Sequence, residues 1–354
     1  MALILLGIDE AGYGPLLGPL CVGAAAIRVG SWMPGDPAPD LWKLLAEAVC
    51  KEPREAKSRI PVADSKRLKL ANSTATKHPL VHLERGVLTF LRNTTGVGTD
   101  LPKSDLELFA LLGVDLEPRP WYMGEASRVP VGTSGSALSI HANLLGGALE
   151  RAGVEPLALW CRAIGETRFN TIVGETGSKA EATASVIGEY LRLAFVRWAA
   201  PGKPDSSGGA HDVAELRVVC DRQGGRTSYA PMLARECRSL PDASTRWSCA
   251  VKVLEESDRC SRYEVHDRER RMTVTFMPEA ESAHLPVALA SMIAKLVREL
   301  SMARFNRYWS ARAKELRGVE LKPTAGYRQD AARWLHDARE ILSPDDRRAL
   351  VRNA

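Results

Sequence analysis

The sequence lacks most features that mark secreted or membrane proteins. Only seven of its 354 residues are cysteines, an odd number at wide spacings without a C-x-x-C pair. This pattern disfavours both a disulfide framework and a zinc knuckle. No apolar run approaches the roughly 18 residues of a membrane span. The short apolar start runs directly into Asp9 and Glu10, which is typical of a buried strand rather than a signal peptide. We therefore expect a soluble, cytoplasmic protein.

The composition is close to that of an average globular protein. It is 45% hydrophobic and 26% charged, enough for a large buried core. The formal net charge of +5 is compatible with a polyanionic partner such as nucleic acid. Many soluble enzymes carry a similar excess, so charge alone does not decide the function.

The pattern of apolar residues predicts strands interleaved with helices, and hence an α/β layered fold. The expected strands are 3–8, 20–29, 216–220, 250–254 and 272–276. The expected helices are 106–112, 138–152, about 178–195 with a capping box at its start, and 287–309. We predict one domain spanning 1–354, with an insertion or subdomain at about 70–165, a polar connector at 201–211 and a helical segment at about 310–354.

Acidic residues occur where predicted strands end or turns begin. Asp9 and Glu10 close the first strand, Asp221 closes a later one, and Glu281 precedes the long helix. Adjacent strand residues point to opposite faces, so Asp9 and Glu10 can share a site only if the strand ends or bends there, as Gly12 permits. Carboxylates gathered in this way would suit Mg²⁺ or Mn²⁺. Spacing alone also allows them to be simply solvated.

Four segments together resemble the type 2 ribonucleases H (ribonucleases HII and HIII), in that family's order. They read GIDEAGYGPLLGP from Gly7 to Pro19, DSKRL from Asp64 to Leu68, ES at Glu281 continuing to ASMIAK ending at Lys295, and GY at Gly326-Tyr327. The first match is highly specific and the third fairly specific. The other two gain weight from their order.

The resemblance implies a ribonuclease H-like mixed sheet flanked by helices, and a role for each matching position. Asp9, Glu10, Asp221 and Glu281 would be the metal-binding catalytic carboxylates. The loop Gly12, Tyr13 and Gly14 would lie against the ribose 2′-hydroxyl, which distinguishes RNA from DNA. A backbone phosphate would be held by Ser65 and Lys66, and Tyr327 would pack on the sugar beside the scissile phosphate.

The sequence departs from the family at several points. Tyr13 stands where the family carries Arg, Lys or Thr between the two glycines, and a tyrosine cannot neutralise a phosphate. Glu281 matches ribonuclease HIII, whereas ribonuclease HII usually has Asp there. The insertion has no counterpart in the family pattern, nor does the chain show the extra N-terminal substrate-binding domain of many ribonucleases HIII.

The leading hypothesis is therefore a monomeric endonuclease that uses two divalent metal ions to cut the RNA strand of RNA–DNA hybrids. It would leave 3′-hydroxyl and 5′-phosphate ends. Two alternatives remain open: a nuclease of the same fold that acts on another nucleic-acid structure, and a non-catalytic nucleic-acid-binding protein. Four clustered negative charges beside a phosphate backbone would be of no use to the second.

Overall fold

A mixed seven-stranded sheet forms the centre of the molecule, in the order β5-β2-β1-β6-β9-β8-β7. The computed structural model describes residues 2–56, 58–74, 76–98, 100–199, 214–224, 226–238 and 249–353. The strands of the sheet are β1 (Ala2–Ala11), β2 (Leu20–Val29), β5 (Val154–Ile164), β6 (Ala214–Asp221), β7 (Ala250–Glu256), β8 (Ser261–His266) and β9 (Arg271–Met277). Parallel pairing joins β1 to β6 and β6 to β9, and the other neighbours are antiparallel.

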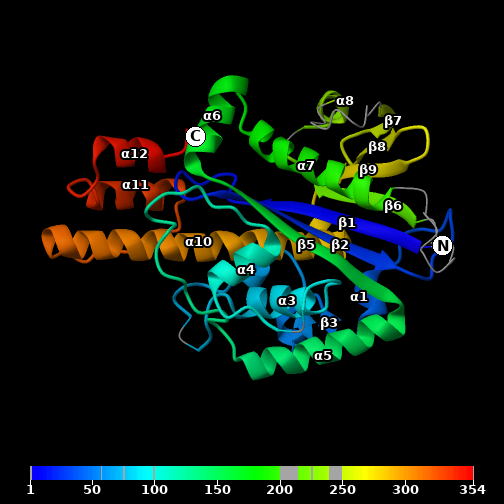
Figure 1. Cartoon of the computed structure of the whole chain (residues 1–354), viewed down its shortest axis with the longest axis horizontal. Helices are drawn as coiled ribbons and strands as arrows, with labels where there is room; N and C mark the ends of the chain where they lie inside the picture. Colours follow the sequence, from blue (N-terminus) through cyan, green and yellow to red (C-terminus); the bar gives the residue numbers. More distant parts are fainter. Residues whose placement is uncertain are drawn as a thin grey trace.

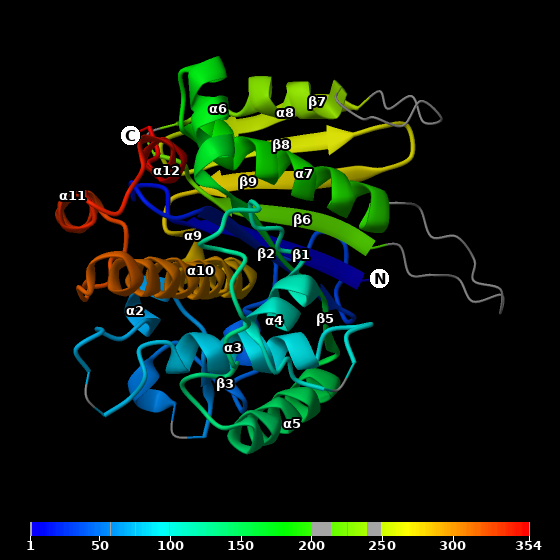
Figure 2. The ribbon, with the colours of Figure 1, turned by 60° about the vertical axis from the view of Figure 1, so that its left-hand side comes forward.

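Helices cover both faces of this sheet, with α10 on one side and α7 on the other (Figures 1 and 2). The longer helices are α3 (Val81–Arg92), α5 (Gly135–Ala152), α6 (Glu166–Thr176), α7 (Ala180–Trp198), α8 (Ala230–Arg238), α10 (Leu285–Arg317) and α11 (Arg328–Asp337). The shorter ones are α1 (Leu41–Leu44), α2 (Ser65–Leu68), α4 (Asp105–Leu112), α9 (Ala280–Ala283) and α12 (Pro344–Leu350), with a 3-10 turn at Pro53–Glu55.

The two helical layers explain why β1 is a continuous apolar run. Leu3 and Leu5 pack into the core cluster that includes α10 and α3. Ile4, Leu6 and Ile8 pack into the cluster that includes α7. Because alternate residues of a strand face opposite sides, a strand buried on both faces needs apolar residues at every position.

Two glycines let α10 lie directly on the strands. A Cβ atom at Gly7 would lie 2.2 Å from the backbone of Pro286, and one at Gly23 would lie 2.2 Å from the carbonyl oxygen of Ala290. Only glycine permits this approach. The close packing fixes α10 against β1 and β2, and with it the side chains that α10 presents to the edge of the sheet.

The segment between β2 and β5 forms a helical layer below α10, where α3, α4 and α5 pack near one another (Figure 2). A small parallel pair, β3 (Val49–Cys50) with β4 (Ile60–Pro61), lies beside it. The predicted boundary at about 165 is wrong, because β5 is an edge strand of the central sheet and pairs with β2 over ten positions. The inserted helical layer therefore ends before Val154.

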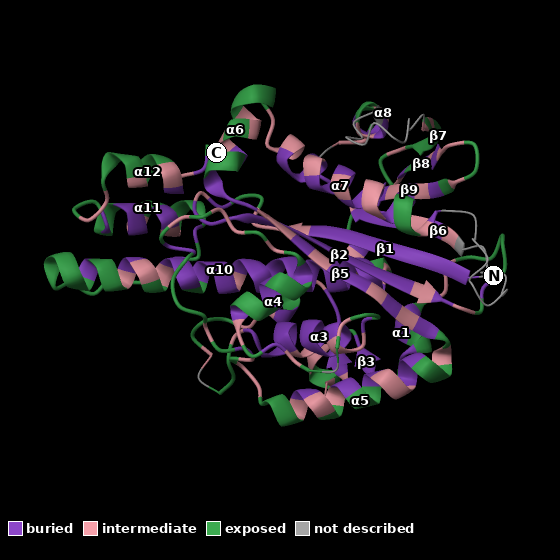
Figure 3. Cartoon of the chain, viewed as in Figure 1, coloured by how far each residue is buried: buried purple, intermediate pink, exposed green. Residues whose placement is uncertain are grey.

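The prediction of a mixed sheet flanked by helices is confirmed. The capping box expected at Ser178 is wrong, since Lys179 caps α7 without a side-chain hydrogen bond. The connector predicted at 201–211 lies outside the described residues. In the part of the chain that is described, no helix is both long and apolar enough to cross a membrane. The C-terminal half of α10 projects beyond the sheet together with α11 and α12. Most of the exposed residues of α10 lie in this half (Figure 3).

Candidate active site

The carboxylates of Asp9 and Asp221 lie side by side because their strands run in parallel. Ile8 of β1 pairs with Cys220 of β6, so the next residue on each strand reaches the same edge of the sheet. Asp9 is only 9% exposed. Burial raises the pKa of Asp9 well above its usual range, and the charges of Glu10 and Asp221 raise it further.

Glu10 reaches the same edge from the adjacent position of β1. Its backbone N–H donates to Oδ1 of Asp9 at 2.7 Å. Burial and the charge of Asp221 raise the pKa of Glu10 to about 7, while Lys66 acts in the opposite direction. β1 continues in register with β2 through Asp9 and Glu10 to Ala11, and the chain turns only at Gly12, which has a φ of 93°.

Glu281 joins the group from α9, which follows β9. The N–H of Ala280, at the start of α9, donates to Oδ1 of Asp221 at 3.1 Å and ties this helix to the end of β6. Burial raises the pKa of Glu281, as do the charges of Asp221 and Asp64. When protonated, Glu281 is close enough to hydrogen-bond Asp221. Asp9 and Glu281 thus each lie within electrostatic reach of at least one of the two carboxylates between them, Glu10 and Asp221.

The donor chemistry of these four side chains fits a hard divalent cation. Burial raises the pKa of every one of them, and the charge of a neighbouring carboxylate raises it further for Asp9, Glu10 and Glu281, which a bound cation would counteract. In addition, Oε2 of Glu281 is buried and has no hydrogen-bond partner among the described residues. The side-chain conformations do not yet form a ligand sphere, because no group of three or more Asp, Glu, His or Cys in the described ranges is arranged to hold an ion.

Ser65 and Lys66 lie at the start of α2, which Asp64 caps by accepting the N–H of Lys66 at 3.0 Å. The Lys66 ammonium acts on Glu10, Asp221 and Glu281 alike, lowering the pKa of each. Ser65 is only 4% exposed, and its hydroxyl accepts a hydrogen bond from Ser291 of α10 at 3.0 Å. Lys66 therefore faces the carboxylates, whereas Ser65 fastens α2 to α10.

The loop between β1 and β2 presents Tyr13 to solvent. Its side chain is 38% exposed, and burial together with the charge of Glu10 raises the pKa of Tyr13. The neighbouring Gly12 has no room for a side chain, since a Cβ atom would lie 2.8 Å from the carbonyl oxygen of Pro19. Gly14 is open, because a Cβ atom there would meet no other atom within 4 Å. The loop thus leads from the carboxylates to an exposed aromatic ring.

The pair Gly326-Tyr327 is bonded directly to this loop. The N–H groups of Leu16 and Leu17 donate to the carbonyl oxygen of Gly326 at 2.8 and 3.2 Å. Tyr327 is 49% exposed, and the ammonium of Lys295 lies 6.0 Å from its ring centroid. Segments more than 300 residues apart in the sequence therefore form one surface.

Lys295 also pairs with Glu299 one turn later on α10, with the Nζ and Oε1 atoms 2.8 Å apart. The sequence predicts such a pair on an exposed helix face. The structure instead buries Lys295 to 9% exposure and adds Lys69, whose Nζ lies 3.8 Å from the same carboxylate.

Three buried charged residues that support the loop were missed from sequence: Arg298, Arg352 and Glu166. Arg298 donates to the carbonyl oxygens of Pro19, Leu17 and Ala325 at 2.6, 3.1 and 3.1 Å. Glu166 accepts the N–H of Gly18 at 3.1 Å and the Tyr122 hydroxyl at 2.7 Å. Charged side chains are mostly exposed, so their types gave no signal of this role.

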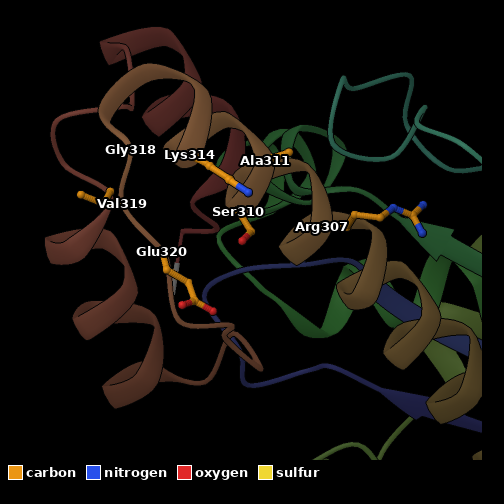
Figure 4. A pocket seen from close by; sticks show the side chains of 7 residues that line it. All are labelled: Arg307, Ser310, Ala311, Lys314, Gly318, Val319 and Glu320. Carbon is orange, nitrogen blue, oxygen red and sulfur yellow. The ribbon is translucent and has the colours of Figure 1, made fainter.

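A separate groove lies at the C-terminal end of α10 (Figure 4). It is lined by Arg307, Ser310, Ala311, Lys314, Gly318, Val319 and Glu320. None of the predicted site residues lines it. The groove is therefore distinct from the candidate site.

Comparison with models of protein families finds no match, and comparison with curated proteins finds none. Several solved structures are similar to the chain at low identity. A variant of Bst-RNase HIII is 16% identical with a TM-score of 0.41, and the match covers 98% of this chain and 64% of that one. Another structure of Bst-RNase HIII, in complex with Mn²⁺, is 15% identical with a TM-score of 0.39, covering 99% and 66%.

Two further solved structures are similar over most of their own length. Ribonuclease HII from Archaeoglobus fulgidus, solved in a complex with PCNA, is 13% identical with a TM-score of 0.38, covering 99% of this chain and 94% of that one. Ribonuclease H2 from Pyrococcus horikoshii OT3 is 14% identical with a TM-score of 0.39, covering 98% and 92%. These neighbours carry the names of the family that the sequence motifs resemble, the type 2 ribonucleases H. The chain spans slightly less than two thirds of the length of the Bst-RNase HIII variant, at 64%.

Proposed function

We propose that the chain is a metal-dependent endonuclease that hydrolyses the RNA strand of RNA–DNA hybrids to 3′-hydroxyl and 5′-phosphate ends. One observation carries this proposal. Carboxylates from three separate segments, β1, β6 and α9, meet beside one lysine at the edge of the sheet. Their mutual repulsion is unfavourable to folding, so a charged partner is the simplest reason for the arrangement.

Asp9, Glu10, Asp221 and Glu281 would hold the metal, Mg²⁺ or Mn²⁺. Two such ions would supply an activated water and stabilise the leaving oxygen of a phosphodiester. Lys66 is placed to attract the phosphate to this edge, because it already offsets the charge of three of the carboxylates. The four acids would then be occupied by metal and not repel the substrate.

The exposed surface beside the carboxylates suits a nucleic-acid partner. Tyr13 and Tyr327 offer aromatic faces that can pack on sugars or bases. The backbone of Gly14 can approach a ribose closely, since this residue carries no side chain and the space beside it is open. On this proposal the loop contacts the 2′-hydroxyl and Tyr327 packs on the adjacent sugar.

The test compares wild type with Asp9→Asn on three labelled duplexes in Mg²⁺ and in Mn²⁺. The duplexes are an RNA–DNA hybrid, DNA with one embedded ribonucleotide, and all-DNA. We expect wild type to cut the hybrid and spare all-DNA, and Asp9→Asn to lose at least about 10³-fold in rate. The variant should melt no lower than wild type, because it removes one of several repelling buried charges. A folded wild type that cuts no hybrid while a known hybrid nuclease does would overturn the proposal.

One observation favours a second candidate, a nuclease of the same fold with another substrate. Tyr13 supplies no positive charge where the resembling family usually has one. Cleavage of the embedded ribonucleotide or of all-DNA in preference to the hybrid would support this candidate. Hybrid binding without any cleavage, retained in Asp9→Asn, would instead leave a binding protein.

A further inference from the structure

The segment that follows α12 returns to the loop between β1 and β2. The N–H of Arg352 donates to the carbonyl oxygen of Leu16 at 2.8 Å. Asn170 of α6 holds the same segment from its other side, donating to the carbonyl oxygen of Val351 at 2.8 Å and accepting the N–H of Asn353 at 2.6 Å. Residues 350–353 thus lie between α6 and the loop, near the mark C in Figure 1.

The guanidinium of Arg352 is inserted under the loop. It is 2% exposed and donates to the carbonyl oxygens of Gly12, Tyr13 and Gly18 at 2.5, 3.1 and 3.5 Å. Its planar group also lies 3.8 Å from the ring centroid of Phe169. A guanidinium group carries several N–H donors in a fixed plane, so it can bind several carbonyl oxygens at once. A hydrophobic side chain could fill the same space but could not hold the loop backbone by hydrogen bonds.

Two arginines, Arg298 and Arg352, bind carbonyl oxygens at opposite ends of the loop. Arg298 binds the carbonyl oxygens of Leu17 and Pro19, at the end that joins β2. Arg352 binds those of Gly12 and Tyr13, at the end that carries the exposed ring. Burial and the nearby charge of Arg298 lower the pKa of Arg352 to about 10.

Gly326 and Glu166 hold the loop at Leu16, Leu17 and Gly18, and the two arginines add contacts to its carbonyl oxygens. Gly12 and Gly18 both have positive φ, at 93° and 85°, and glycine adopts many other conformations at little cost. An arginine placed under both of their carbonyl groups selects one conformation. Burying the Arg352 charge costs free energy, and its hydrogen bonds to the loop offset that cost. We infer that this one loop conformation is needed for function.

We propose that Arg352 is a positioning residue that fixes Gly12 and Tyr13 in the conformation that meets the ribose of the substrate. Selectivity for RNA over DNA then depends on residues 350–353, far from the carboxylates in sequence. This inference rests on the proposed function of the loop. It adds a residue and a segment that neither the motifs nor the carboxylate chemistry include.

The test uses Arg352→Met, which keeps the length and packing but removes the donors, and Arg352→Lys, which keeps the charge and can reach fewer carbonyl groups. Asn170→Ala loosens the segment without touching the guanidinium, and remains informative if Arg352→Met fails to fold. Arg347→Met on the exposed face of α12 is the matched control. For each, kcat and KM are measured on the hybrid and on a hybrid with a single 2′-deoxy substitution at the cleaved position, together with hydrogen exchange of residues 12–18.

We expect Arg352→Met to raise KM for the hybrid about tenfold with kcat changed less than about threefold. Its preference for the 2′-hydroxyl should fall by a similar factor, and exchange of residues 12–18 should accelerate. Arg352→Lys should recover part of each change, Asn170→Ala should show a smaller version, and Arg347→Met should match wild type. Faster exchange with unchanged KM and preference would show a purely structural role and overturn the proposal.

The failure of the proposed function would be visible separately. If wild type cuts no duplex, that function is wrong, and equilibrium binding of hybrid and all-DNA without metal takes the place of kinetics. Arg352→Met would then still be expected to reduce the binding preference for the hybrid and to speed exchange in the loop. An unchanged preference and unchanged exchange would overturn the positioning role whatever the catalytic result.

Discussion

At the scale of single residues, Tyr13 is the position where this chain differs most usefully from the family that it resembles. The side chain is 38% exposed and lies near the charge of Glu10. A phenol can stack on a base or sugar, but only a cation can pair with a phosphate. The residue at position 13 should therefore affect how strongly the binding of a nucleic acid depends on salt concentration.

Tyr13→Arg should strengthen binding of the RNA–DNA hybrid, because a guanidinium at this exposed place can contact one more phosphate. We expect the apparent affinity at low salt to rise about three- to tenfold, and the slope of log affinity against log salt concentration to steepen by about 1. Fluorescence anisotropy over a salt series measures both. Tyr13→Phe keeps the ring and should leave the slope as in wild type, and an unchanged slope in Tyr13→Arg would show that no phosphate lies within reach.

At the scale of elements, the site depends on how closely α10 lies on the sheet. Ser291 and Lys295 are carried by α10, and the former connects to Asp9 and to Ser65 of α2. The helix can approach because Gly23 on β2 has no side chain. The contact between α10 and the sheet therefore both stabilises the fold and positions Ser291 and Lys295 beside the site.

Gly23→Ala should both destabilise the protein and impair the site. The added Cβ would lie 2.2 Å from the carbonyl oxygen of Ala290, so the helix or strand must move. We expect a loss of about 2–4 kcal/mol in the free energy of unfolding, measured by urea unfolding. Gly174→Ala in α6 is the control, since it meets no atom within 4 Å and should stabilise by about 0.5–1 kcal/mol. An unfolding midpoint of Gly23→Ala at or above that of wild type would contradict this account.

The elements that could be predicted are those whose apolar pattern is unambiguous. The run from Leu20 to Val29 coincides with β2, and Pro286 begins a long helix as expected. The strand β5 was not predicted because it contains Pro156 near its start, and proline is typical of turns. Proline is tolerated here because β5 is an edge strand, and the pairing with β2 is irregular beside it. Only the sheet order reveals that condition.

At the scale of the whole molecule, the site divides into a predictable and an unpredictable part. The grouping of Asp9 with Asp221 was expected from the resemblance to the type 2 ribonucleases H, because their spacing alone also allowed them to be solvated. The buried side chains of Arg298, Arg352 and Glu166 were not, because nothing local distinguishes them from the solvated charges that surround them. Their hydrogen-bond partners lie up to 340 residues away in the sequence. Their role in holding the loop is therefore visible only in the folded structure.

The carboxyl group of Glu166 makes this assembled network sensitive to pH. Its side chain is fully buried and joins Gly18 of the loop to Tyr122 of the inserted layer. Burial raises the pKa of Glu166 from 4.5 to about 7, although both of those donors favour the charged form. The folded protein therefore holds a proton here that the unfolded chain has released between these two pH values.

Glu166→Gln should remove this pH dependence, because an amide resembles the protonated carboxyl and Oε2 has no hydrogen-bond partner to lose within the described part of the chain. A raised pKa means that the stability contributed by the neutral carboxyl is complete below pH 4.5 and is lost as the pH rises through about 7. The variant should thus gain stability over wild type between pH 5 and pH 8, by up to about 3 kcal/mol. Urea unfolding across that range measures the difference, with the exposed Glu47→Gln as control. Parallel stability curves for Glu166→Gln and wild type would show that the buried carboxyl does not titrate between pH 5 and pH 8, and would contradict this prediction.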